Sequence, residues 1–486
     1  MKRLIFLFLL LPAFLYSQES IEFNLDDCIK YAIRNSPAAK SAKASYKARS
    51  SRINAFNAGY LPQLNLTASL PGLEQEIVPV TQGVGSDEFQ YRSQYYSSGG
   101  LTLTQKIAPL GSQFTVFSGL SRIDLFSTGN NRSTWLANPV SISYNQPIFT
   151  YNAMKWEIKV QDIREQMNDN EYSTAIENIS MSTAQIFFDL YIAKMNLRNA
   201  EQNIGVNDTL NTISKGRFEV GRIAENDLLQ SELAYLNAKN AYERALLDYR
   251  QVMEEFSVTL GISGNSQIQV NPPLIVPTLE IDEEFAVRQA MENNPDIKNI
   301  EIDNLRAAIN LKASESNNGI NANLIASYGL NNSADLLPDA YRDLSTNQRL
   351  NLTLQVPVFQ WGRGSSEIEA ALEDKNRTEI NNELQKKNLE IEVRYQALRL
   401  NQLIRQVEIS AKADTIAARR FEVAINRYYV GKIDLNSFFI AQNEKDSAFQ
   451  SYIQMLKTFW TSYYNLRRQT LYDFISDKKI VHLLDN

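Results

Sequence analysis

Two long stretches of the chain contain no proline, and this feature most limits what it can fold into. Residues 148–271 and 358–486 lack proline, and beyond Gly364 the second stretch has a single glycine, Gly431. Both stretches are rich in residues that favour helices, with apolar residues recurring at intervals of three and four. Because proline and glycine interrupt helices, each stretch is predicted to form two long helices joined by one turn, at Gly221 and at Gly431.

The helices on either side of these turns are unusually long. Each arm has roughly 40 to 60 residues, so at a rise of about 1.5 Å per residue the longest reaches on the order of 90 Å. Such a rod exceeds the diameter of a small domain. The chain is therefore predicted to form antiparallel helical hairpins, although its 486 residues would otherwise suggest several globular domains.

The sequence also repeats itself once. Three motifs occur twice in the same order: Asn-x-Pro at 35–37 and 293–295, Gln-Pro-Ile-Phe at 146–149 with Val-Pro-Val-Phe at 356–359, and Arg-Phe-Glu-Val-Gly-Arg-Ile at 217–223 with Arg-Tyr-Tyr-Val-Gly-Lys-Ile at 427–433. The first repeat is predicted to cover residues 18–270 and the second residues 271–475, followed by a tail at 476–486. Each repeat is expected to run helix, strand, strand, long helix, turn, helix.

Four short segments alternate apolar and small polar residues with period two, which distinguishes them from the helices. They are residues 64–70, 140–145, 323–330 and 350–356. Each has one apolar and one polar face, as a transmembrane β-strand needs with lipid on one side and water on the other. Four strands cannot close, and open edges are not tolerated in hydrocarbon, so several chains must share one barrel. A trimer would supply twelve strands.

The stretch between the first two predicted strands is much longer than its counterpart in the second repeat. Residues 71–138 are rich in Gly, Ser, Tyr and Gln, and they contain short alternating runs at 101–104 and 114–117. We interpret this stretch as a large extracellular loop with a hairpin of its own that extends above the membrane.

The N-terminus has the layout of a secretory signal peptide. Basic residues at positions 2 and 3 precede an apolar run at 4–15, so residues 1–17 are predicted to be removed and the mature chain to begin near Gln18. The run is too short to cross a bilayer as a helix, and no later stretch approaches the required ~20 apolar residues. Helical membrane insertion is therefore excluded.

Charge and composition exclude several function classes. The formal net charge is −6, and loss of Lys2 and Arg3 with the signal would make it −8, which argues against a nucleic-acid partner. The chain has one cysteine and one histidine, too few for a zinc site or an intrachain disulfide. Cys28 is predicted to lie on the buried face of a first helix, and His482 on the surface of a loose tail. No metal or cofactor is expected.

The duplicated motifs, together with Trp361-Gly362-Arg363-Gly364, resemble those of the TolC-like outer-membrane efflux proteins over essentially the whole mature chain. The resemblance implies a mainly α fold with a transmembrane β part: a homotrimer in the outer-membrane lipid, with a twelve-stranded barrel and an α-helical barrel in the periplasm. It also implies docking on a periplasmic adaptor, which joins the channel to an inner-membrane pump or to the ABC exporter of a type I secretion system. Such a protein is a passive conduit and not an enzyme.

The resemblance assigns roles to particular residues. The two turns would lie at the periplasmic tip and dock the adaptor, through Val220, Gly221, Arg222, Val430, Gly431 and Lys432. A hairpin without a partner is the alternative. A carboxylate just past each turn would constrict the pore, a role that Asp227 suits, whereas the second repeat has Ser437 at that offset with Asp434 nearby. An ordinary solvated helix charge is the other interpretation of Asp227.

A last group of residues marks the passage from strand to helix. These are Pro147, Phe149, Pro357, Phe359, Gly362 and Gly364. The run Gly362-Arg363-Gly364 superficially suggests phosphate binding, but it lacks the lysine of a P-loop, so a structural junction is favoured.

Two other function classes compete with the channel. A soluble periplasmic coiled-coil scaffold or adaptor would have similar hairpins, but it has no need of lipid-length alternating segments. A secreted enzyme lacks support, because no nucleophile, base and metal stand at recognisable spacing. The transported substrate is not indicated by the sequence.

Overall fold

The computed structural model describes residues 20–81, 85, 87–126, 131–262 and 267–482. The predicted signal peptide lies outside these residues. The chain divides into two compact units, the first made of Met1–Tyr46, Asp169–Pro295 and Lys387–Asn486, and the second of Lys47–Asn168 and Asp296–Lys386. Each unit thus combines residues from both predicted repeats.

The order of the elements recurs in the two halves of the chain. The first half contains β1 (Ser20–Asn24), α1 (Leu25–Asn35), α2 (Pro37–Ala58), β2 (Gln63–Thr81), β3 (Asp87–Ile107), β4 (Ser112–Phe126), β5 (Arg132–Ile148), α3 (Ala153–Glu219) and α4 (Glu225–Leu260). The second half contains β6 (Gln267–Asn271), α5 (Glu283–Asn293), α6 (Pro295–Asn317), β7 (Asn321–Ala334), the short helix η1 (Asp339–Tyr341), β8 (Ser345–Gln355), α7 (Arg363–Tyr429), α8 (Leu435–Thr470), β9 (Tyr472–Asp473) and β10 (Lys478–Lys479). Helices α3 and α7 have 67 residues each, and α4 and α8 have 36 each. The predicted helical hairpins and internal duplication are confirmed.

The duplicated Asn-x-Pro motif separates two helices in each half. Asn35 is the last residue of α1 and Pro37 the first of α2, and Asn293 and Pro295 stand in the same places between α5 and α6. A residue before proline avoids the helical conformation, and Ser36 accordingly has an extended ψ of 150°. Proline itself is well suited to the first helical position, because the amide that it lacks would have no partner there.

The first unit has one large apolar core. A parallel pair of strands, β1 and β6, lies beside α1 and α5, and the core continues between the long helices around Phe187, Phe256 and Tyr463. Cys28 is fully buried in this core on α1, as predicted. In the described residues no helix combines the length and the hydropathy needed to cross a membrane.

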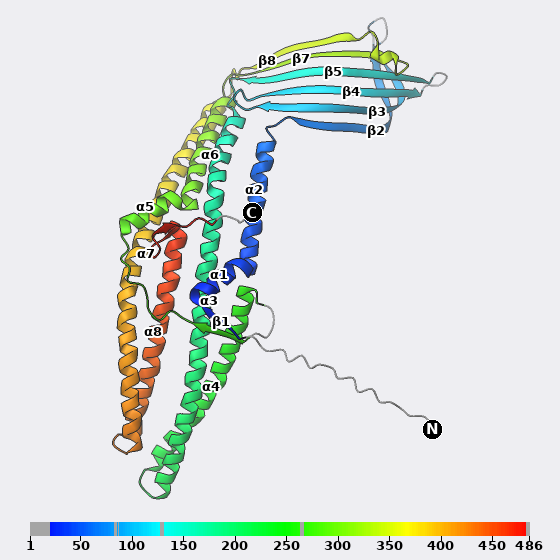
Figure 1. Ribbon diagram of the computed structural model, residues 1–486. Coiled ribbons are helices and arrows are strands. Elements are labelled where there is room, and N and C mark those ends of the chain that lie inside the picture. Colours follow the sequence, from blue (N-terminus) through cyan, green and yellow to red (C-terminus); the bar gives the residue numbers. More distant parts are fainter. Residues whose placement is uncertain (1–19, 82–84, 86, 127–130, 263–266, 483–486) are drawn as a thin grey trace, which may run out of the picture. The chain divides into compact units, whose positions relative to one another are not determined.

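The second unit contains an antiparallel sheet, and here the strand prediction needs correction. The four predicted segments are present as β2, β5, β7 and β8, but in the described chain the sheet has six strands in the order β2-β3-β4-β5-β7-β8 (Figure 1). Residues 71–138 are therefore not a long loop: β2 continues to Thr81, and β3 and β4 are inserted between β2 and β5. Glycines at 99, 100 and 119 and a phenylalanine at 117 interrupt the period-two pattern, which concealed these two strands.

The tail prediction was also wrong, because His482 is held in place. Its Nε2 lies 3.1 Å from Oε1 of Glu177, and its backbone N–H donates to Oγ of Ser173 at 3.0 Å. Glu177 is completely buried and also pairs with Arg467 at 3.0 Å. A buried carboxylate needs such partners, and this need ties the tail to α3.

Candidate functional site

The turn between α3 and α4 closes by backbone geometry that requires glycine. Gly221 has φ +70°, in the left-handed region, and its N–H donates to the carbonyl of Phe218 at 2.8 Å. The N–H of Arg222 reaches back to the carbonyl of Arg217, also at 2.8 Å, which completes the pattern of a helix ending in a left-handed glycine. Gly431, at φ +71°, builds the same turn between α7 and α8.

Each turn presents an apolar side chain to solvent. Val220 is 68 % exposed and Val430 67 %, at equivalent positions of the two repeats. Arg222 and Lys432, two residues further on, are exposed as well. Each turn thus combines an exposed apolar side chain with a nearby basic side chain, and a protein partner can recognise such a surface.

The structure brings the ends of the two hairpins together in the first unit. Leu210 of α3 packs with Tyr428 of α7 and Phe438 of α8 in a separate apolar cluster. The guanidinium of Arg217 lies 5.5 Å from the centre of the Tyr428 ring, a cation–π contact. The two turns are thus part of one packed tip and not of two independent hairpins.

The two candidate pore carboxylates have different local roles. Asp434 is the N-cap of α8, where its carboxylate accepts a hydrogen bond from the N–H of Ser437 at 2.8 Å. Hydrogen bonds from Ser437 hold the pKa of Asp434 below its usual value. Asp227 stands exposed in the first turn of α4, whose N-cap is Ala224 without a side-chain bond. Of these two carboxylates, only Asp434 makes a capping hydrogen bond within the described chain, and Asp227 makes none.

The strand-to-helix junctions hold exposed aromatic residues in strained backbone. Between β5, which contains Pro147, and α3, Phe149 has φ +62° and is 72 % exposed. Between β8 and α7, the rings of Phe359 and Trp361 lie 4.5 Å apart, and Trp361 is 89 % exposed at φ +51°. Exposed aromatic rings at strand ends suit the interface between membrane and water.

The other junction residues have backbone roles. Pro357 precedes this aromatic pair, and Gly362 takes φ +83° immediately before α7. Gly364 is the second residue of α7, where a Cβ would come within 2.6 Å of Oε1 of Gln360. No phosphate-binding role is needed to account for these glycines.

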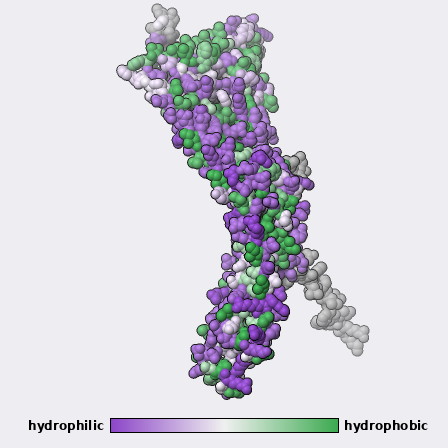
Figure 2. Space-filling view, turned by 90° about the vertical axis from the view of Figure 1, so that its left-hand side faces the viewer, coloured by the Kyte–Doolittle hydropathy of each residue, from purple (hydrophilic) through white to green (hydrophobic). Residues whose placement is uncertain are grey.

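The sheet has one apolar and one polar face. On β7 and β8, Leu324 stands opposite Leu352 and Ala326 opposite Leu350, whereas the neighbouring pair Asn323 and Thr353 points to the other side. Every residue of β8 is exposed within the single chain. In Figure 2 apolar and polar side chains are interspersed in the part of the molecule that contains the sheet. A large exposed apolar face of this kind marks a surface that is covered in the working molecule.

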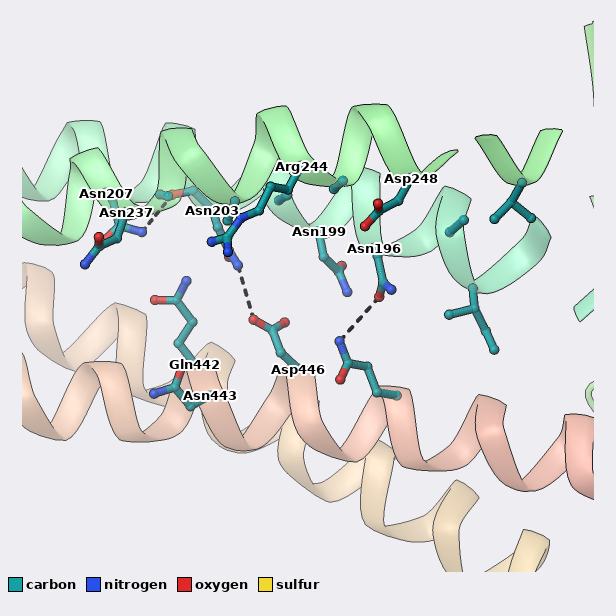
Figure 3. Close-up of a pocket in the computed structure, with 18 of the residues that line it drawn as sticks. Asn196, Asn199, Asn203, Asn207, Asn237, Arg244, Asp248, Gln442, Asn443 and Asp446 are labelled. Atoms are coloured by element: carbon teal, nitrogen blue, oxygen red, sulfur yellow. Dashed lines mark hydrogen bonds between the residues drawn. The ribbon is translucent and has the colours of Figure 1, made fainter. Parts of the chain in front are cut away.

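A polar pocket of about 960 Å³ lies among α3, α4 and α8 of the first unit. Four asparagines line it from one face of α3, at positions 196, 199, 203 and 207 (Figure 3). The Nδ2 group of Asn203 donates to Asp446 at 3.2 Å, and Gln450 donates to Asn196 at 3.4 Å. The side-chain oxygens of the buried Asn207 and Gln442 have no hydrogen-bond partner within the described chain. Buried acceptors of this kind are usually satisfied by water, so the pocket belongs to a hydrated region of the helices.

The family is shown by a match that covers most of the chain. A family model described as "Outer membrane efflux protein" matches residues 28–261 and then 286–470, which is most of the chain and both repeats. The chain belongs to the outer membrane efflux protein family. As a member of this family of efflux channels it is an outer-membrane protein. No curated protein matches it.

Solved outer-membrane channels share the fold of this efflux protein at low sequence identity. The CmeC channel of Campylobacter jejuni superposes with a TM-score of 0.65 at 14% identity, covering 92% of this chain and 85% of that one. VceC of Vibrio cholerae gives 0.64 at 13% identity, with 92% and 95% covered. The MtrE channel of Neisseria gonorrhoeae gives 0.62 at 13% identity, with 92% and 88% covered.

Sequence reasoning missed two features of this efflux protein. The strands β3 and β4 were concealed by their glycines. The asparagine row of α3 was visible in the sequence, because its spacing of three, four and four places the residues on one helix face. A search for repeated polar residues at helical spacing would have found it.

Proposed function

We propose that three copies of this chain join edge to edge into one channel, a passive conduit for export in a tripartite efflux or type I secretion system. The observation that carries the proposal is the sheet, which has one apolar face, one polar face and two edges that no strand of the described chain covers. Such a sheet is stable in a bilayer only when its edges are paired.

The strand directions permit this pairing. The six strands of the sheet alternate in direction, so β8 of one copy and β2 of the next run antiparallel when laid side by side. Both edge strands carry exposed leucines on the apolar face, among them Leu64, Leu66, Leu350 and Leu352. A soluble scaffold protein would expose these leucines to water without compensation.

The helices also have apolar stripes available for neighbouring copies. On α7, Ile409, Ile416 and Val423 recur at intervals of seven and are exposed. On α4, Leu229, Leu233 and Leu236 recur at four and three and are exposed too. Stripes at these spacings are the contact surfaces of helices that pack side by side. Association of the copies would cover them.

The packed tip is the proposed docking surface for a periplasmic adaptor, which would join the channel to an inner-membrane pump or an ABC exporter. Val220 and Val430 supply the apolar contact, and Arg222 and Lys432 supply charge. Asp227 is proposed to face the pore near this tip. Threefold symmetry would turn it into a ring of three carboxylates that disfavours anions.

Membrane fractionation and bilayer recording test the proposal. After a carbonate wash the protein should remain in the outer-membrane fraction, and the purified protein should conduct ions across a planar bilayer. A protein that leaves the membrane in the wash, and that gives no conductance, would instead be the soluble coiled-coil scaffold.

A further inference from the structure

We infer that β3 and β4 are wall strands of the pore, so that each chain contributes six membrane-spanning strands and three chains close a ring of eighteen. The inference rests on the proposed function and deepens it. The segment that contains β3 and β4 has the composition of an extracellular loop, and three observations on these strands contradict that role.

The first observation is the continuity of the two faces. One row of directly opposed residues crosses five strands from β2 to β7 with apolar side chains throughout: Leu64, Leu103, Val116, Ile142 and Tyr328. The adjacent row crosses all six strands with polar side chains throughout: Gln63, Thr104, Thr115, Ser143, Ser327 and Arg349. Opposed residues of antiparallel strands share a face, so β3 and β4 extend both the lipid-facing and the water-facing surface.

The second observation is the position of the turn between β3 and β4. The side-chain amide of Asn152, just before α3, donates to the carbonyl of Ala108 at 2.7 Å, and Gln146 donates to the carbonyl of Leu110 at 3.0 Å. The turn therefore lies at the end of the sheet where β5 passes into a helix. A hairpin confined to the extracellular side would not reach this end.

The third observation is the length of uncharged strand. Residues 93–105 of β3 and 112–121 of β4 contain no charged side chain. Both lengths cover the ~9 to 11 residues that a strand needs to cross a membrane. The first charges beyond them on β4, Arg122 and Asp124, pair with each other at 2.8 Å. On β4 these charges begin only beyond the uncharged length.

The consequence is a wider opening at the membrane. Barrel diameter grows roughly linearly with strand number, so eighteen strands give a ring about 1.5 times as wide as twelve. The row on the polar face presents mainly hydroxyl groups, with Arg349 as its only charge. A bore of this width would admit larger hydrated solutes than a ring of twelve strands.

Labelling of cysteines introduced one at a time, in lipid nanodiscs, tests the inference. We would place cysteine at two adjacent positions on each inserted strand, Leu103→Cys and Thr104→Cys on β3, and Thr115→Cys and Val116→Cys on β4. The native Cys28 needs no replacement, because burial raises the pKa of its thiol to about 12 and keeps it protonated and unreactive. A membrane-impermeant maleimide is applied. Labelling after denaturation gives the total thiol, from which the one thiol of Cys28, measured on the unsubstituted protein, is subtracted.

The expected result is alternation. Cysteines at 104 and 115 should react at least ten times faster than those at 103 and 116. Equal, rapid labelling at all four positions would overturn the inference, since it would place β3 and β4 in water. Two pairs on two strands are used so that one variant that fails to assemble does not decide the outcome.

A control pair on β8 separates this inference from the proposed function. Thr353→Cys should be labelled and Leu352→Cys protected, whatever β3 and β4 do. Loss of alternation on β8 contradicts the channel itself, whereas loss on β3 and β4 alone contradicts only the strand count. An electron cryomicroscopy map of the wild-type particle gives the count directly: eighteen strands supports the inference, and twelve refutes it.

Discussion

Replacing Gly100 by alanine should destabilise the sheet, whereas the same change at Gly99 should not. Both glycines lie in β3, one after the other, on opposite faces. A Cβ built on Gly100 would come within 2.5 Å of Cε2 and 2.8 Å of Cζ of Phe117, closer than real Cβ atoms come to their neighbours. A Cβ on Gly99 meets nothing within 4 Å.

The magnitude follows from two terms. Alanine in a strand is favoured over glycine by about 0.5 to 1 kcal/mol, and this term is common to both variants. Overpacking against the Phe117 ring and the carbonyl oxygen of Ser118, 3.2 Å from the built Cβ, costs typically 1 to 3 kcal/mol, and this term applies only to Gly100→Ala. The difference between the two variants should therefore be about 1 to 3 kcal/mol per subunit. Gly99→Ala should be neutral or slightly stabilising.

Urea unfolding in lipid vesicles, followed by tryptophan fluorescence, would measure the free energies of unfolding. Phe117→Ala supplies a further check, because removal of the ring should abolish the cost of Gly100→Ala in a double-mutant cycle. Equal effects of the two glycine substitutions, or a cost that persists without the ring, would refute the packing of Phe117 over Gly100 and with it the register of β3 and β4.

Three further predictions concern the tip, the core and the cysteine. Val220→Asp combined with Val430→Asp should abolish export in a drug- or toxin-efflux assay and leave the assembled channel intact. The isosteric Val→Thr pair should affect export less. Unchanged export by the Asp pair would show that the tip is not the docking surface. Glu177→Gln should lower the free energy of unfolding by about 3 to 5 kcal/mol, because the buried Arg467 loses the charge of its partner. Glu444→Gln, at an exposed ion pair, should cost less than about 1 kcal/mol. Similar values for both would show that burial does not strengthen the Glu177–Arg467 pair. Cys28 should stay unlabelled by maleimide at pH 8 in the folded protein and react fully in denaturant; rapid labelling of the folded protein would contradict the packing of α1.

Much of the fold could be predicted because the long helices, their turns and several strands each leave a recognisable pattern in the local sequence. Proline-free stretches indicate the helices. Gly221 and Gly431 indicate the turns between them, because each turn needs a residue with left-handed backbone conformation, which glycine adopts readily. The second half of β8 alternates without interruption from Leu350 to Gln355, and β7 departs from alternation in its central part only at Ile325, so the sequence predicts both as strands. Duplication then allowed one half to support the assignment of the other.

The errors have physical causes. Strands β3 and β4 contain Gly99, Gly100 and Gly119, which weaken strand propensity, and Phe117 stands on the polar face because its ring covers glycine backbone. Because the Phe117 ring packs against a glycine of the neighbouring strand, neither strand shows the alternation of apolar and polar residues at this place. The position of His482 depended on a buried carboxylate some 300 residues earlier in the chain, and no local pattern reports such a pairing.

The central claim is that one chain is an incomplete pore wall that its own copies complete. Native mass spectrometry of the protein, extracted from outer membranes in mild detergent, tests this claim most directly. The account predicts a single species with the mass of three mature chains. A stable single chain that stays soluble after the detergent is removed would contradict it.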